Sequence, residues 1–182
     1  MRNRSTWLAG VLGGALVTLV ATEVRAVTAT RALDAPAVLH FQRADAALAA
    51  GDGAGAARHW RDGHAVLLAS RRWEGLVEAG DLYRRIGARG GFHAAALARA
   101  RECYLTALLR ARAERSLEGV LHATEAFLDL GDEQVVERGL DIARRLAAAD
   151  ADPRGRARVD LLAARWAARS ASTGRSTTEN LR

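Results

Sequence analysis

The side chains best suited to catalysis or metal binding in this sequence are five histidines and one cysteine. His59 and His64 are five residues apart, a spacing that does not place both on one face of a helix, and no HExxH or CxxC motif occurs. Cys103 lies inside a stretch with helical character rather than at a helix N-terminus, where a thiol would be activated. We therefore predict no catalytic residue, no metal site, no cofactor and no enzymatic activity.

Paired acidic residues are the second group with chemical potential. Glu74 and Glu78 are four residues apart, and so are Glu125 and Asp129. On one helix, like charges at this spacing cost a few tenths of a kcal/mol, so local helix stability does not explain them. Two interpretations remain open. The acids either receive a cationic partner or form a solvated face that nearby arginines such as Arg84 neutralise.

The composition indicates that helices carry these side chains. Apolar residues make up 49% of the 182 residues, aromatic residues only 5%, and there are two prolines. The apolar residues are mostly Ala and Leu, which lose little rotamer freedom in a helix. The length suits one compact domain. We therefore predict an all-α domain over residues 36–169.

Capping and turn residues divide this domain into seven expected helices. Their starts are marked by Asp34-Ala35-Pro36, Gly51-Asp52-Gly53, Ser70, Gly90-Gly91, Ser116, Asp132 and Asp152-Pro153. The third helix is expected to end at Gly87. From Ser170 onward the sequence is rich in Ser, Thr, Arg and Asn without periodicity, so residues 170–182 are predicted to be a disordered tail.

Small and large residues recur at fixed spacings in successive helix pairs. One pair has Leu76, Ala79, Gly80 and Tyr83 followed by Ala100, Tyr104 and Ala107; the next has Val120, Ala123, Thr124 and Phe127 followed by Val136, Leu140 and Ala143; the first keeps only Ala56, Trp60 and Gly63. The pattern resembles the tetratricopeptide repeat over about residues 36–146. The resemblance implies antiparallel helix-turn-helix pairs stacked as a short solenoid of about three repeats, with a C-terminal capping helix.

The resemblance implies both a helix contact and a binding surface. Gly80 is expected where two helices touch. In the family, the first helices of the pairs line a concave groove for a protein ligand. The residues that match this face are Glu74, Glu78, Asp81, Glu118, His122, Glu125 and Asp129. We expect them to bind a basic segment of another protein. Because Gly80 and Ala100 are further apart than in the family, a plain helical bundle is the alternative architecture.

The first 26 residues have the anatomy of an export signal. Arg2 and Arg4 precede an uncharged apolar run over residues 7–21, and small residues follow around Ala26. The run is shorter than the roughly 20 residues of a spanning helix, but an uncleaved anchor over residues 7–24 is the alternative. Residues 27–35 are expected to be a linker. In an oxidising compartment the single cysteine forms no intramolecular disulfide, so it is either a buried apolar residue or a link to a second chain.

Charge and export together narrow the expected function. The net charge of +6 is carried by arginines spread over every expected helix, which argues against a nucleic-acid site. We predict an exported or membrane-tethered interaction module or scaffold of the bacterial cell envelope, either periplasmic or anchored in the inner membrane and facing the periplasm. The alternative is a permanent architectural accessory subunit of a membrane protein complex, held by an uncleaved N-terminal helix.

Overall fold

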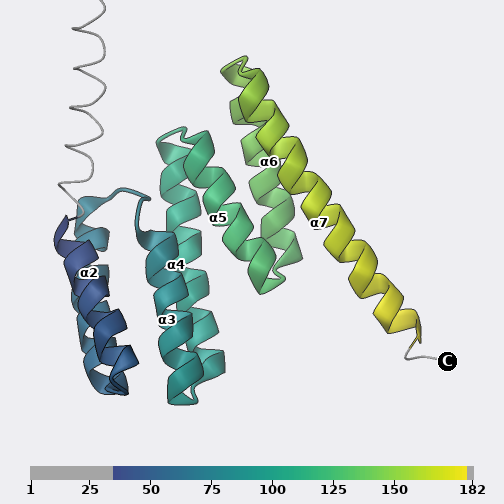
Figure 1. Ribbon diagram of the computed structural model, residues 1–182. Coiled ribbons are helices and arrows are strands. Elements are labelled where there is room, and N and C mark those ends of the chain that lie inside the picture. The colour runs from purple at the N-terminus through teal and green to yellow at the C-terminus, as the bar shows by residue number, and fades with distance from the viewer. Residues whose placement is uncertain (1–34, 180–182) are drawn as a thin grey trace, which may run out of the picture. The chain divides into compact units, whose positions relative to one another are not determined.

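A computed structural model describes residues 35–179, and this part of the chain contains helices and no strand (Figure 1). The first described helix covers residues 35–49. It is followed by α2 (Gly53–Ser70), α3 (Leu76–Gly90), α4 (His93–Ala113), α5 (Leu117–Leu130), α6 (Glu133–Ala149) and α7 (Pro153–Glu179). The predicted all-α class is confirmed. Among residues 35–179, no helix combines the length and the hydrophobicity that a membrane span requires.

The chain divides into two units, residues 1–35 and 36–182, and the helices above belong almost entirely to the second. Residues 1–34 and 180–182 are outside the described part of the chain. The predicted export signal or anchor over residues 1–26 therefore lies outside the described residues. The same holds for the predicted linker at 27–35, except for its last residue.

Most helix boundaries follow the local signals read from the sequence. The Asp52 carboxylate accepts a hydrogen bond from the Gly55 amide at 2.7 Å, and the Ser116 hydroxyl accepts one from the Gly119 amide at 3.1 Å. Asp152 caps α7 in the same way. These side chains satisfy amides that have no partner inside the helix.

The predicted start of the third helix at Ser70 is wrong. Its hydroxyl donates to the Leu67 carbonyl at 2.8 Å, so this residue ends α2. Residues 71–75 form a linker, in which Arg71 and Gly75 have φ values of +59° and +77°. Helix α3 starts only at Leu76 and continues past the predicted end at Gly87 to Gly90.

An arginine of α4 fixes the end of α2 and this linker. The Arg110 guanidinium donates to the carbonyls of Leu67 at 2.9 Å, Leu68 at 3.1 Å and Arg72 at 2.8 Å. Carbonyls in the last turn of a helix have no intrahelical donor, and a cation there also complements the helix dipole. The linker is therefore held by a residue about 40 positions further along the chain, which no local pattern reveals.

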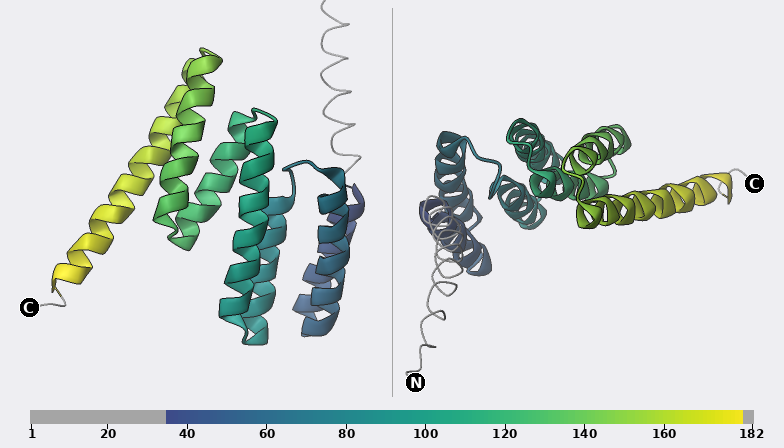
Figure 2. Two further views of the ribbon diagram at one scale, coloured as in Figure 1. Left: turned by 180° about the vertical axis from the view of Figure 1, so that it is seen from behind. Right: turned by 90° about the horizontal axis from the view of Figure 1, so that it is seen from above.

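The C-terminal helix extends further than predicted. Helix α7 continues to Glu179, whereas the sequence predicted disorder from residue 170. Once a helix is nucleated, each added residue forms one more backbone hydrogen bond, and the propensities of Ser, Thr and Arg reduce that gain only slightly. Figure 2 shows the end of α7 running on beyond the neighbouring helices of its unit.

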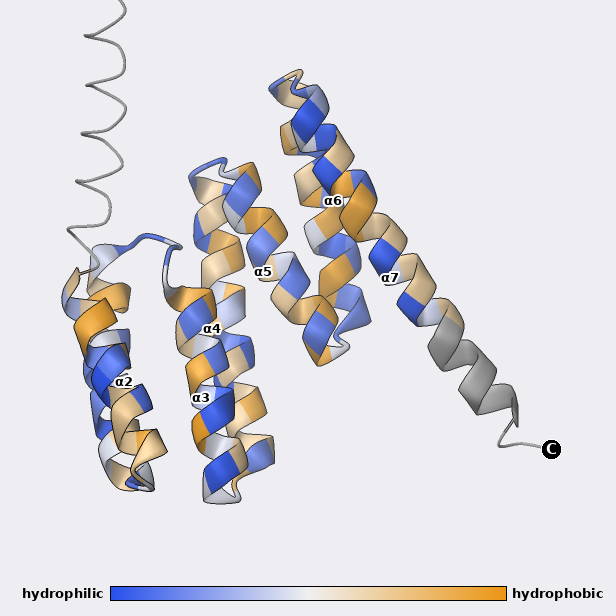
Figure 3. Cartoon of the chain, viewed as in Figure 1, coloured by the Kyte–Doolittle hydropathy of each residue, from blue (hydrophilic) through white to orange (hydrophobic). Residues whose placement is uncertain are grey.

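Consecutive helices pack on one another, and alternate helices also meet. Contacts join α2 to α3, α3 to α4, α4 to α5, α5 to α6 and α6 to α7, and α5 also contacts both α3 and α7. Apolar and polar residues interleave along the helices coloured in Figure 3, and the buried positions of α2 to α6 are mostly apolar residues or glycine. One core cluster contains Tyr104, Phe127 and Leu140, and a second, around Trp60, lies nearer the start of the unit.

Glycines allow the closest helix contacts. A Cβ atom at Gly80 would collide with the ring of Tyr104, at 2.9 Å from Cδ1 and 3.0 Å from Cζ. The predicted helix contact at Gly80 is therefore confirmed, with α4 as the second helix. Gly63 of α2 similarly approaches Phe41, and Gly139 of α6 approaches Thr124. Each of these three helix pairs thus has at least one glycine facing a larger side chain.

Candidate functional site

The structure places six of the seven predicted partner-binding residues on two helices that contact each other. Helix α3 carries Glu78 and Asp81, and α5 carries the four predicted residues from Glu118 to Asp129. Glu74 is the exception, because it lies in the linker before α3. The assumption that Glu74 and Glu78 repel each other on one helix is therefore wrong.

Glu74 has its own partner in the linker. The Arg72 Nε atom donates to the Glu74 carboxylate at 3.1 Å, and the two side chains also form an ion pair through Arg72 Nη2. Partial burial acts to raise the pKa of Glu74, but the hydrogen bond and charge of Arg72 outweigh it and hold the pKa below its usual value. This carboxylate is balanced within the chain.

Asp81 belongs to a network between α3 and α4. The buried Tyr104 hydroxyl donates to the Asp81 carboxylate, and Arg84 Nη1 lies 3.8 Å from the same carboxylate. Burial, followed by the hydrogen bond to Asp81, raises the pKa of Tyr104. The hydrogen bond with Tyr104 is the main cause that raises the pKa of Arg84, and the charge of Asp129 on α5 adds to it. Asp81 therefore helps to fix the Gly80 contact.

Helix α7 supplies arginines to the acids of α5. Arg165 forms an ion pair with Glu125, and Arg169 Nη1 lies 3.7 Å from Asp129. A step of four residues along α5, from Glu125 to Asp129, corresponds to a step of four residues along α7, from Arg165 to Arg169. The two helices therefore run parallel. The four-residue spacing of Glu125 and Asp129, which suggested a cationic partner, is thus matched by two arginines of the predicted C-terminal capping helix.

Two of the predicted partner-binding carboxylates lie near the starts of α3 and α5. Glu78 and Glu118 are exposed in the first turns of these helices, and neither forms an ion pair with another described residue. The positive end of the helix dipole stabilises a carboxylate at this position. The His122 ring lies 6.4 Å from the Trp73 ring in a T-shaped arrangement, and Trp73 packs against Gly119.

A hollow between α5 and α7 adds apolar surface beside the Glu125–Arg165 ion pair. Its volume is about 140 Å³, and it is lined by Leu121, Glu125, Arg158, Leu161, Leu162 and Arg165. Leu161 is 66% exposed, the largest exposure among the large apolar residues of the described part. The hollow therefore brings the Glu125 carboxylate, two arginines and an exposed leucine together.

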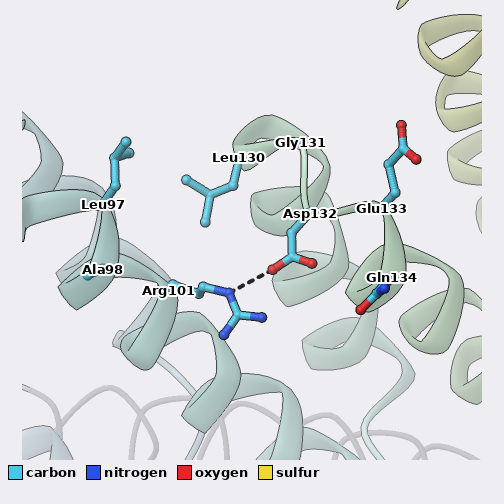
Figure 4. A pocket seen from close by; sticks show the side chains of 8 residues that line it. All are labelled: Leu97, Ala98, Arg101, Leu130, Gly131, Asp132, Glu133 and Gln134. Carbon is cyan, nitrogen blue, oxygen red and sulfur yellow. Dashed lines mark hydrogen bonds and ion pairs between the residues drawn. The ribbon is translucent and has the colours of Figure 1, made fainter. Parts of the chain in front are cut away.

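A larger hollow of about 500 Å³ lies where α4 meets the turn between α5 and α6 (Figure 4). Arg101 crosses it and donates through Nε to the Asp132 carboxylate at 2.7 Å, while its guanidinium lies 5.9 Å from the Phe127 ring centre. The sequence predicted that Asp132 caps α6, but its side chain makes no capping bond. The ion pair thus occupies two of the polar side chains that line this hollow, and Glu133 and Gln134 are the others.

The cysteine lies in the core. Cys103 is 1% exposed, and its Sγ atom is 3.6 Å from Nε2 of His64. Burial raises the pKa of the Cys103 thiol to about 12, so the nucleophilic thiolate does not form near neutral pH. Burial also lowers the pKa of His64. Of the two interpretations of Cys103, the structure favours the buried apolar residue.

Three side chains from the first two described helices also come together. Potential ligand atoms of His40, His59 and Asp62 lie within 4.8 Å of one another. His59 and Asp62 are both on α2, but His40 comes from the preceding helix, so the spacing of histidines along one helix could not reveal the group. In the sequence, the only indication that His40 lies near His59 was the predicted antiparallel pairing of the first two helices.

Comparisons with family models, with curated proteins and with solved structures give no match for this chain. The functional argument therefore depends on its own surfaces.

Proposed function

We propose that this chain is an exported or membrane-tethered interaction module, built as a short tetratricopeptide-like solenoid, that binds another protein through the exposed face of α3, α5 and α7. The observation that carries the proposal is the parallel pairing of α5 with α7, together with the contact of α5 with α3. Alternate helices that touch in this way form one face, as the first helices of stacked repeats do.

The glycine contacts support the repeat-like architecture. Gly80 against Tyr104 is a close approach between the two helices of a pair, at a position where the resemblance expects a small residue, and Gly139 against Thr124 is a close approach within the next pair. The linker before α3 and the long α4 are departures from regular repeats. Arg110 compensates for the first departure by fixing the linker to α4.

The charge of the face suggests the kind of partner. Arg165 and Arg169 balance Glu125 and Asp129, so the carboxylates that remain for a partner are Glu78 and Glu118. We propose that a basic segment of the partner lies across the starts of α3 and α5, close to His122. Rim charges of this kind mainly guide the encounter between two proteins, and such guidance weakens with salt.

Site-specific photo-crosslinking in the native host tests the proposed face. A photoreactive side chain at position 78 or 118 should yield an adduct with the partner, whereas one at Glu137 should not. Glu137 is a matched control because it is also an exposed helical glutamate, but it lies on α6. Two results would place the partner-binding surface elsewhere. One is an equal yield of adduct from position 137, and the other is a copurifying partner that is captured from neither position 78 nor position 118.

Export and membrane attachment are proposed from residues 1–26 and tested separately. The intact mass of the native chain should correspond either to a start at Val27 or to an uncleaved chain in the membrane fraction. A salt wash in mild detergent then distinguishes the interaction module from an architectural subunit. The module should dissociate from its partner, whereas a permanent subunit should remain at constant stoichiometry.

A further inference from the structure

Three side chains with metal-binding atoms meet across the first helix pair. His40 lies on the helix at residues 35–49, and His59 and Asp62 lie on α2. One potential ligand atom of each is within 4.8 Å of the other two. Nδ1 of His40 is 4.0 Å from Oδ2 of Asp62, and the centres of the two imidazole rings are 6.5 Å apart.

A close helix contact holds this group together. A Cβ atom at Gly63 would lie 2.6 Å from Cε1 of Phe41 and 3.1 Å from Cβ of His40. Glycine therefore lets α2 approach the preceding helix directly beside the three side chains. Two helical backbones position the side chains, so only small rotations about their side-chain bonds are needed to bring the ligand atoms closer.

Two of the imidazole nitrogens are poorly satisfied without a further partner. Nδ1 of His40 and Nδ1 of His59 are both buried, and neither has a hydrogen-bond partner among the described residues. A buried polar atom is normally paired, and an exception calls for a specific explanation. A cation held between the two rings would give the lone pair of a neutral imidazole the partner that the fold does not supply.

We propose that His40, His59 and Asp62 bind one divalent transition-metal ion of the Zn²⁺ class. Two imidazole nitrogens and one carboxylate oxygen suit Zn²⁺ and its neighbours in the first transition row, whereas Mg²⁺ and Ca²⁺ favour sites made of oxygen. Asp62 is exposed, so a water molecule completes a tetrahedral site. The ion would connect the helix at residues 35–49 to α2. This site is separate from the α3, α5 and α7 face, and the inference does not depend on the proposed function.

Cobalt titration of the full chain in mild detergent tests the site. Co²⁺ in a tetrahedral site absorbs visible light, so the absorption should saturate at one ion per chain, and Zn²⁺ should abolish it. His59→Gln and Asp62→Asn should each weaken Co²⁺ binding by about tenfold or more. His93→Gln is the matched control, because His93 is an exposed histidine at the start of α4, and it should leave the affinity unchanged.

A second measurement remains informative if a variant folds poorly. In the unmodified chain, Zn²⁺ should slow amide hydrogen exchange in residues 35–49 and in α2, because the ion joins these two helices, and leave α5 and α6 unaffected. Any of three results would overturn the proposal. The chain forms no one-to-one Co²⁺ complex, the ligand variants bind Co²⁺ as tightly as the control, or Zn²⁺ leaves amide hydrogen exchange in residues 35–49 and in α2 unchanged.

Discussion

Replacing Gly80 with alanine should destabilise the unit, although alanine favours helices. The new Cβ atom would enter the ring of Tyr104, which is 0% exposed and is held by its hydrogen bond to Asp81. On the opposite side, the Trp60 Nε1 atom donates to the Ala79 carbonyl at 2.6 Å, which restricts any outward shift of α3. Neither helix can therefore move without losing a buried contact.

The expected magnitude follows from two opposing effects. Overpacking a buried contact costs about 1–3 kcal/mol. Exchanging glycine for alanine inside a helix returns about 1 kcal/mol. The net loss for Gly80→Ala should be about 1 kcal/mol, which lowers the melting temperature of a domain of this size by roughly 2–4 °C. Gly80→Leu places more atoms in the same space and should cost more.

Urea and thermal unfolding followed by circular dichroism measure this loss. Gly53→Ala is the control, because a Cβ atom there meets nothing within 4 Å and should leave stability unchanged or slightly raised. In a double-mutant cycle, Tyr104→Leu should remove most of the additional cost of Gly80→Ala. A melting temperature that rises with Gly80→Ala as it does with Gly53→Ala would refute the assigned helix contact.

Three further predictions concern other helix contacts. Cys103 should resist maleimide labelling at pH 8 in the folded chain and react only on unfolding, because the thiol is buried and its pKa is raised to about 12; fast labelling without denaturant would contradict its place in the core. Arg110→Leu should lower the free energy of unfolding by about 1.5–3 kcal/mol in urea melts, because three carbonyls lose a charged donor; an unchanged midpoint would show that the linker is held otherwise. Arg165→Ala with Arg169→Ala should cost less than about 1 kcal/mol, because all four side chains of these ion pairs are substantially exposed. That difference should disappear at high salt, and a loss that persists there would indicate packing rather than charge.

The helix starts were predictable because capping is local. Asp52, Ser116 and Asp152 each bond an amide two or three residues away, so the sequence contains both partners. Ser70 carries the same signal, but it ends α2. The structure at Ser70 depends on distant residues, since Arg110 binds the Arg72 carbonyl of the linker and Gly119 provides space for Trp73.

Distance along the chain also explains what was missed in the two candidate sites. Arg165 is 40 residues from Glu125, and His40 is on a different helix from His59, so neither pairing leaves a periodic pattern. The seven predicted partner-binding residues follow from positions on single helices. Such positions place six of them on two helices that contact each other, but they do not reveal the charges that neighbouring helices bring to these residues.

The position of α7 changes which part of the acidic face a partner would use. Because α7 runs parallel to α5 and brings arginines to Glu125 and Asp129, a basic segment would have to displace existing ion pairs to bind there. At the starts of α3 and α5 it meets Glu78 and Glu118 without such competition. Electrostatic guidance should therefore be directed at the N-terminal ends of these helices, while the exposed Leu161 offers apolar contact further along the same face. A charge reversal at Glu78 and Glu118 should then slow association more than one at Glu125 and Asp129, whose replacement would also leave the arginines of α7 unpaired.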